Sequence, residues 1–252
     1  KMLKKILLIG ELSDACHKAL DVATESGLIS GYEIYDENKN INFDDDYILM
    51  KGYIHSEDFL RTVISISKSI CLRDGLSKPL LTHCGVFRNG DKQFILTDAA
   101  CITYPDSTQR KGIIRNAAKL YFQMNPSKKI CNVSLLCAGG DTNAKANPEL
   151  YSWWCDNKDE FVSDNIDLRL EQLDTALNLD VRKFKGLSGD VANVVVCPEI
   201  NMGNCIWKCL TSLSNGWVCA GILTGAPIPV VLNSRGDSAE SMLYSIQIAT
   251  EK

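Results

Sequence analysis

The residues best suited to chemistry stand near the C-terminus, in the run Ser234-Arg235-Gly236-Asp237-Ser238-Ala239-Glu240. A short apolar run ends just before it and a helical pattern follows, so the glycine permits a tight turn at a strand-to-helix junction. The free N–H groups at the start of a helix attract anions. Arg235 adds a planar guanidinium that can hold two anion oxygens, and Ser234 adds a hydroxyl.

A purely structural interpretation of the same run is also open. In it, Asp237 caps the helix, Glu240 closes a capping box, and Arg235 is a solvated surface charge. The local sequence does not decide between an anion site and an ordinary helix start.

A second junction of the same kind runs from Met50 to Asp58, where a strand meets a glycine and then a helix that Ser56 can cap. His55 can orient a substrate or accept a proton, because the ordinary pKa of histidine lies near neutrality. It can equally be an ordinary histidine beside a helix start. Lys51 and Arg61 supply positive charge nearby.

Further polar residues follow other predicted strands, but each of them alone is weaker evidence for a functional site. Arg73 lies upstream of Thr82-His83, which either lines a cleft or sits on an edge strand. Asp98 follows a strand directly, and Asn204 follows another as either a helix cap or a substrate-binding amide. The run from Cys137 to Asn143 resembles a Gly-rich phosphate loop, but it lacks both the P-loop lysine and the dinucleotide-binding spacing. We recognise no cluster with metal-ligand spacing.

Composition describes an ordinary globular chain and limits its partners. The formal net charge of −4 over 252 residues argues against a broad nucleic-acid footprint, so local groups must hold any anionic substrate. Eleven cysteines without a C-x-x-C pair favour reduced thiols in a reducing compartment. Four of them lie in apolar runs and are expected to be buried: Cys131, Cys137, Cys197 and Cys219. The first apolar run is too short for a signal peptide, and no run reaches the length of a membrane span. We therefore expect a cytoplasmic protein.

Strands that alternate with helices must position these residues. The Asn89-Gly90 turn between Leu80–Phe87 and Gln93–Thr97 predicts a hairpin, so the sheet is mixed and the fold is α/β. The stretch from Lys145 to Asp167 is the least readable. The other predicted strands are Leu3–Ile9, Tyr47–Met50, Ile130–Cys137, Val191–Cys197, Trp217–Leu223 and Pro229–Leu232. Helices are expected after Ser13, Ser56 and Ser107, around Ile206–Leu213 and around Met242–Ile246.

Taken together, these segments resemble the phosphate acetyltransferase and phosphate butyryltransferase family. The resemblance runs from about Tyr47 to the C-terminus. It rests on MKGYIHSEDFLR, LTHCGVF, LTDAA with Pro105 downstream, PEINMGN with Lys208, and GAPIPVVLNSRGDSAES. The last of these is the most specific, and the motifs occur in the family's order.

The resemblance implies two α/β lobes of mixed, mostly parallel sheets with a cleft between them, similar to isocitrate and isopropylmalate dehydrogenases. We expect residues 1–104 and 222–252 to form the first lobe, with a shortened N-terminus, and residues 105–221 the second. The implied reaction converts acyl-CoA and phosphate reversibly into acyl phosphate and CoA. CoA and phosphate are then substrates, no cofactor or metal is needed, and a homodimer or higher homo-oligomer is expected.

The resemblance also implies roles for individual residues. Ser234 and Arg235 would lie at the reacting phosphate and carbonyl. In the acetyl branch, an acidic residue six positions after that arginine is the base. This chain has Ser241 at that position, and its pattern SRxDSAES is that of the butyryl branch. His55 and Asp237 are our candidates for the missing base. The substrate-binding candidates are Lys51, Ser56, Arg61, Arg73, Asp98, Asn204, Ser238 and Ser241.

Two other functions stay open at this point. One is a non-catalytic relative that binds acyl-CoA or acyl phosphate, which the altered N-terminus and the non-acidic Ser241 would suit. The other is an NAD-dependent decarboxylating dehydrogenase of related architecture. The absence of an aspartate cluster and of a dinucleotide fingerprint in the sequence disfavours that enzyme.

Overall fold

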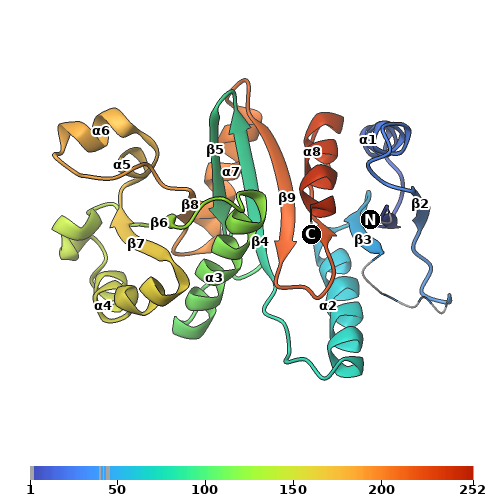
Figure 1. The fold of residues 1–252 in the computed structure, drawn as a ribbon, viewed down its shortest axis with the longest axis horizontal. Coiled ribbons are helices and arrows are strands. Elements are labelled where there is room, and N and C mark those ends of the chain that lie inside the picture. Colours follow the sequence, from blue (N-terminus) through green and yellow to red (C-terminus); the bar gives the residue numbers. More distant parts are fainter. Residues whose placement is uncertain (1–2, 40, 42, 44–45, 252) are drawn as a thin grey trace. The chain divides into compact units, whose positions relative to one another are not determined.

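The computed structural model describes residues 3–39, 41, 43 and 46–251, and the chain divides into two compact units. Unit 1 combines residues 1–83 with residues 218–252, and unit 2 comprises residues 84–217. Figure 1 shows that strands alternate with helices in both units. The expected α/β fold is therefore confirmed.

The strands of unit 1 follow one another in the order β2-β1-β3-β10-β9. β1 (Lys5–Ile9) pairs in parallel with β2 (Gly31–Ile34) and with β3 (Tyr47–Lys51). β3 also pairs in parallel with the short β10 (Val230–Val231), which is antiparallel to β9 (Val218–Thr224). Since parallel strands end at the same edge of a sheet, the residues that follow β3 and β10 come close together.

Three helices accompany this sheet: α1 (Asp14–Glu25), α2 (Ser56–Arg73) and α8 (Ala239–Thr250), with α8 packed against α1 and β9. The Ser13 side chain accepts a hydrogen bond from the N–H of Cys16, which confirms the expected cap of α1. The central strands read as continuous apolar runs because both of their faces are buried. Six of their side chains are fully inaccessible: Ile6, Leu7, Leu8, Ile48, Leu49 and Met50.

The strands of unit 2 follow in the order β4-β5-β8-β6-β7. β4 (Thr82–Asn89) and β5 (Lys92–Thr97) form the antiparallel hairpin that the Asn-Gly turn predicts. β8 (Val194–Val196) pairs in parallel with β5 and with β6 (Cys131–Leu136), and β6 pairs in parallel with β7 (Ile166–Glu171). Four carboxyl ends therefore share one edge of this sheet.

Two long helices of unit 2 bear on function: α3 (Ser107–Met124), which Asp106 caps, and α7 (Ile200–Ser212), which Glu199 caps. Shorter elements fill the stretch that the sequence left unreadable and the segment after β7. They are η1 (Gly140–Thr142), η2 (Ala144–Ala146), α4 (Pro148–Asn157), η3 (Lys158–Asp164), α5 (Leu173–Leu177) and α6 (Leu179–Phe184).

Some local expectations differ from the structure. α2 begins at Ser56, so His55 occupies the cap position and the expected Ser56 cap is wrong. The two units meet along the chain at residues 83/84 and 217/218, whereas the sequence placed the lobe boundaries at 104/105 and 221/222. The difference arises because β5 pairs with β8, which ties the hairpin to the unit 2 sheet. In the described part of the chain, no helix is both long and apolar enough to cross a membrane.

A buried histidine in unit 1 makes stability depend on pH. His83 is 4% exposed, and its Nε2 lies 3.3 Å from the carbonyl oxygen of Leu232. Burial lowers the pKa of His83 to about 4, although the contact with Leu232 opposes this shift. The unfolded chain then binds a proton that the folded chain excludes as the pH falls from about 6.5 toward 4.

We therefore expect the free energy of unfolding to fall by roughly 3 kcal/mol across that interval, with full stability above about pH 6.5. Replacing His83→Gln keeps an amide donor for Leu232 and should remove most of this dependence in urea titrations at several pH values. His17→Gln, at an exposed position of α1, is the control. An unchanged pH profile in the His83 variant would contradict the assignment.

Candidate active site

A carboxylate braces the loop between β10 and α8. Oδ2 of Asp237 accepts hydrogen bonds from the backbone N–H of Ser234 at 2.8 Å and from Nδ2 of Asn233 at 2.9 Å. The N–H of Asp237 in turn donates to the carbonyl of Ser234 at 3.1 Å. Asn233 is 3% exposed, so the loop is anchored at the point where it leaves the sheet. Arg235 and Gly236 project from this ring as its exposed tip.

The start of α8 decides only which residue caps this helix. Ser238 is the capping residue, and its hydroxyl accepts a hydrogen bond from the N–H of Ser241 at 3.2 Å. The interpretation with an Asp237 cap and a Glu240 capping box is therefore wrong. The Asp237 carboxylate instead closes the preceding loop through Ser234 and Asn233.

Lys51 brings a second cation to the same sheet edge. It ends β3, next to β10, and is only 3% exposed. Burial lowers the pKa of Lys51, and the nearby charge of Arg235 lowers it further, while Asp237 acts in the opposite direction. Two positive groups from distant parts of the chain thus lie close enough to repel each other. Such a pair is stabilised when an anion binds between them.

Tyr53, which the sequence analysis did not select, positions the arginine. The Cζ atom of Arg235 lies 5.7 Å from the centre of the Tyr53 ring, within cation–π range. The turn before it is tight: a Cβ atom on Gly52 would lie 2.5 Å from the carbonyl oxygen of Glu11. Only glycine fits there. The Gly-Tyr pair directly after Lys51 was the sequence signal for this contact.

The remaining candidates of unit 1 do not all gather at this loop. His55 is exposed at the start of α2, and its side chain makes no capping hydrogen bond. Ser56 is the first helical residue, and Arg61 forms an exposed ion pair with Glu57 at 2.6 Å. Arg73 lies at the opposite end of α2, about 25 Å along the helix axis, where it binds Asp74 and the carbonyl of Phe43.

Ser241 faces the interior of unit 1 and supports the sheet. It is 8% exposed, and its hydroxyl accepts a hydrogen bond from the N–H of Cys219 on β9 at 3.2 Å. One helical turn later, the hydroxyl of Ser245 accepts from the N–H of Gly221 at 3.1 Å. Two serines of α8 therefore satisfy two N–H groups of β9.

Asp98 and Asn204 come together in unit 2. Oδ1 of Asp98 accepts hydrogen bonds from the N–H groups of Ala100 and Cys101 at 2.8 and 2.9 Å, which shapes the turn after β5. Nδ2 of Asn204 lies 3.4 Å from the carbonyl oxygen of Ala99. A Cβ atom on Gly203 would lie 2.3 Å from the carbonyl of Asp98, so α7 packs directly on this turn. Asn204 lies inside α7 and is not its cap.

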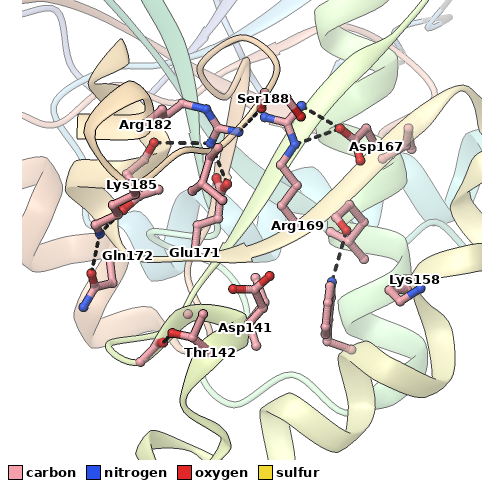
Figure 2. Close-up of a pocket in the computed structure, with 18 of the residues that line it drawn as sticks. Asp141, Thr142, Lys158, Asp167, Arg169, Glu171, Gln172, Arg182, Lys185 and Ser188 are labelled. Atoms are coloured by element: carbon pink, nitrogen blue, oxygen red, sulfur yellow. Dashed lines mark hydrogen bonds and ion pairs between the residues drawn. The ribbon is translucent and has the colours of Figure 1, made fainter. Parts of the chain in front are cut away.

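A separate cavity of about 700 Å³ lies within unit 2, over β7 and the η1 loop. Figure 2 shows it with the Arg182 and Arg169 side chains on one side and Asp141 pointing into it from the other. Its lining includes the Gly-rich run that the sequence singled out, Gly139–Thr142, but none of the candidate residues.

The arginines of this cavity are engaged in structural contacts. Arg182 is 2% exposed and pairs with Glu171 at 2.5 Å, while Glu171 also accepts from the hydroxyl of Ser134 at 2.6 Å. Arg169 binds Asp167 and the carbonyl of Asp190. The guanidinium groups of Arg182 and Arg169 are therefore less available to a phosphate than the exposed guanidinium group of Arg235.

Comparisons with known proteins show which family this chain resembles. A model of the family described as phosphate acetyl/butaryl transferase matches residues 44–250. Phosphate butyryltransferase of Clostridium acetobutylicum is 32% identical over 213 residues, which cover 80% of this chain and 67% of that protein. Phosphate acetyltransferase of Rickettsia felis is 28% identical over 209 residues, covering 80% and 58%. A branched-chain phosphotransacylase structure from Enterococcus faecalis V583 superimposes with a TM-score of 0.77 at 23% identity, covering 99% and 98%.

The fold, the basic loop at the strand ends and the named relatives define an acyltransferase of α/β architecture. The chain belongs to the phosphate acetyl/butyryl transferase family. The resemblance seen in the motifs is thus confirmed, and phosphate acyl transfer is the chemistry of the class. Because the matched relatives are named as phosphate acyltransferases, the comparisons favour an acyltransferase over the non-catalytic relative and the dehydrogenase.

The buried cation predicts how phosphate binding depends on pH. Because the folded-state pKa of Lys51 lies below the ordinary value of 10.5, the lysine loses its charge at a lower pH than an exposed one. Affinity for inorganic phosphate should therefore be highest below that pKa and fall as the pH rises through it. Isothermal titration with phosphate between about pH 8 and 10.5 measures this decline.

Lys51→Met should bind phosphate more weakly and lose the alkaline decline. Lys68→Met, on the exposed face of α2, is the matched control and should retain both. A decline of equal size in the Lys51 variant would show that another group titrates.

Proposed function

We propose that this protein catalyses the reversible transfer of a short-chain acyl group between coenzyme A and inorganic phosphate, through a ternary complex. The observation that carries the proposal is the pair of cations Lys51 and Arg235, held near each other at the end of β3 and at the tip of the braced loop. This arrangement favours an oxyanion, and phosphate is the anionic substrate of the family's reaction.

In the proposed mechanism, Arg235 and Lys51 hold phosphate so that one of its oxygens attacks the thioester carbonyl of acyl-CoA. The Ser234 hydroxyl donates to the oxyanion that forms on the carbonyl oxygen. Collapse of this intermediate breaks the carbon–sulfur bond, which gives acyl phosphate and CoA thiolate. The thiolate takes a proton, and the reverse reaction begins when a base removes that proton from the CoA thiol. Holding both substrates in line supplies much of the rate.

Direct transfer, without an acyl-enzyme, suits the thiols of unit 1. Cys219 lies on β9 near the loop, but it is 1% exposed, and burial together with Asp237 raises its pKa well above the ordinary value of 9.0. A nucleophilic cysteine needs the opposite, an accessible thiol with a lowered pKa. Phosphate itself is therefore the proposed nucleophile.

His55 is the proposed base for the CoA thiol. Its imidazole is exposed and takes no part in capping α2, while Oδ2 of Asp237 is already occupied by two donors. The substrate-binding roles of Ser56, Arg61, Ser238, Asp98 and Asn204 remain proposals that rest on the family's motifs. Arg73 and Ser241 are weaker candidates, because each is engaged elsewhere.

Location and assembly complete the proposal. None of the eleven cysteines forms a disulfide, which suits the reducing cytoplasm. A homodimer or larger homo-oligomer is consistent with the apolar side chains that α6 and the following loop expose, Phe184 at 92% and Leu187 at 40%. The butyryl-like SRxDSAES run favours acyl chains longer than acetyl.

Phosphate-dependent loss of acyl-CoA thioester absorbance tests the reaction. Arg235→Ala should lower kcat about 10²–10³-fold, because the donor that neutralises the reacting oxygens is lost. Arg235→Lys should lose less, since it keeps the charge but not the two-pronged geometry. Arg88→Ala, exposed in the β4–β5 hairpin, is the control and should behave as the wild type.

The kinetic pattern tests the ternary complex. Initial rates with acetyl- to hexanoyl-CoA as the varied substrate, at several phosphate concentrations, should give intersecting lines. Parallel lines would indicate an acyl-enzyme. Thioester loss at the same rate with and without phosphate would sink the whole proposal.

The base assignment predicts a pH signature. His55→Gln should slow the reaction of acyl phosphate with CoA about 10²-fold at pH 7. The deficit should shrink above about pH 8.5, where a thiol ionises without help. Rates at saturating acyl phosphate across this range measure the effect.

His17→Gln serves again as the control for a lost exposed imidazole. A His55 deficit that stays constant with pH would assign that residue to substrate positioning instead of proton transfer.

A further inference from the structure

Glu11 lies opposite Tyr53, at the sheet edge that carries the proposed anion site. It follows the end of β1, and β1 is the parallel neighbour of β3. The N–H of Tyr53 donates to the carbonyl of Glu11 at 2.7 Å, and the N–H of Glu11 donates to the carbonyl of Tyr53 at 3.4 Å. The two residues therefore form an isolated antiparallel bridge between the loops that follow β1 and β3.

This bridge determines on which side the Glu11 side chain lies. Residues directly opposite each other in an antiparallel pair have their side chains on the same face, with Cβ atoms about 4.5–5.5 Å apart. The Tyr53 ring on that face is also the contact of Arg235, whose Cζ atom lies 5.7 Å from the ring centre. The Glu11 carboxylate and the Arg235 guanidinium are therefore neighbours of one aromatic ring.

Two glycines hold the bridged loops tightly together. A Cβ atom on Gly10, which has a φ of +104°, would lie 2.8 Å from the Cβ atom of Ile54. On the other side, a Cβ atom on Gly52 would lie 2.5 Å from the carbonyl oxygen of Glu11. Because neither position has room for a side chain, the main chain of Glu11 has a fixed place beside the loop that carries Tyr53.

The charges of Glu11 and Arg235 are available to a ligand. Both residues are exposed, and neither side chain forms an ion pair among the residues that the structure describes. Glu33 on the neighbouring β2, by contrast, pairs with Lys5 at 3.0 Å. The anion site therefore combines cationic donors with one carboxylate, which can only accept hydrogen bonds while it is ionised.

One acceptor among donors distinguishes phosphate from sulfate. The two anions have the same tetrahedral shape, but inorganic phosphate carries at least one proton at neutral pH, whereas sulfate carries none. A carboxylate forms a charge-assisted hydrogen bond with the protonated oxygen of phosphate. The same carboxylate repels every oxygen of sulfate. Cations alone, such as Lys51 and Arg235, attract both anions and do not make this distinction.

We propose that Glu11 determines the anion specificity of the site, by accepting a hydrogen bond from the protonated oxygen of phosphate while Arg235 and Lys51 hold the other oxygens. The proton stays on phosphate, and no covalent bond forms or breaks in this recognition. The inference rests on the proposed function and adds to it the residue that disfavours sulfate.

Isothermal titration of the intact chain with inorganic phosphate, and separately with sulfate, at neutral pH tests this role. The wild type should bind phosphate about tenfold or more tightly than sulfate. Glu11→Gln replaces the repelling charge with an amide that can donate to either anion. Its sulfate affinity should therefore rise, and the ratio of the two dissociation constants should approach one. Sulfate should also become a stronger competitor of phosphate in the thioester assay.

Glu25→Gln is the matched control, because Glu25 is an exposed glutamate at the other end of α1, about 18 Å along the helix axis. It should keep the wild-type ratio. Since the main chain of Glu11 makes the bridge and its side chain is exposed, circular dichroism should show both variants folded.

The outcomes separate this inference from the proposed function. Equal affinity of the wild type for both anions would overturn the role of Glu11 and leave the anion site standing. An unchanged ratio in Glu11→Gln, or the same fall in Glu25→Gln, would also overturn that role. A wild type that binds neither anion would overturn the anion site itself, and with it the proposed function.

Discussion

The structure of the loop between β10 and α8 depends on a single carboxylate. Asp237 closes a ring with Ser234 and Asn233, and so fixes the path of the chain between the two-residue strand β10 and the first turn of α8. This brace, together with the contact of Arg235 with Tyr53, holds the exposed tip of the loop near Lys51 on β3. The Asp237 carboxylate lies inside the loop. The tip of the loop with Arg235 therefore stays exposed and open to an external anion.

Asp237 only partly offsets the effect of burial and Arg235 on the pKa of Lys51. Burial and Arg235 both lower the pKa of Lys51, and in the proposed function a bound oxyanion would oppose this shift. A protein with an overall net charge of −4 can hold a doubly charged substrate in this way, because the field that matters is local. The tyrosine beneath Arg235 keeps the guanidinium near the loop at little cost in hydration.

Sequence patterns predicted the strand-to-helix junctions well, because buried parallel strands read as short apolar runs that end at glycine or a polar residue. They predicted the chemistry of Arg235 and Lys51, but not Tyr53 or Asn233. Tyr53 acts through a contact with Arg235, which is far away in the sequence, and Asn233 acts through a hydrogen bond to Asp237 inside the loop. The segment from Lys145 to Asp167 was unreadable because it holds short 3₁₀ turns and one brief helix. There, Asn147-Pro148 was the usable start signal.

The hydroxyls of Ser241 and Ser245 on α8 face the sheet of unit 1 and accept hydrogen bonds from β9. The sixth position after Arg235 belongs to the framework in this chain, since Ser241 stands in for a missing strand partner of β9 beside the very short β10. In the proposed mechanism the anion is therefore held from both parts of the unit, by Lys51 at the end of β3 and by Arg235 in the C-terminal segment, while the proposed base His55 precedes α2.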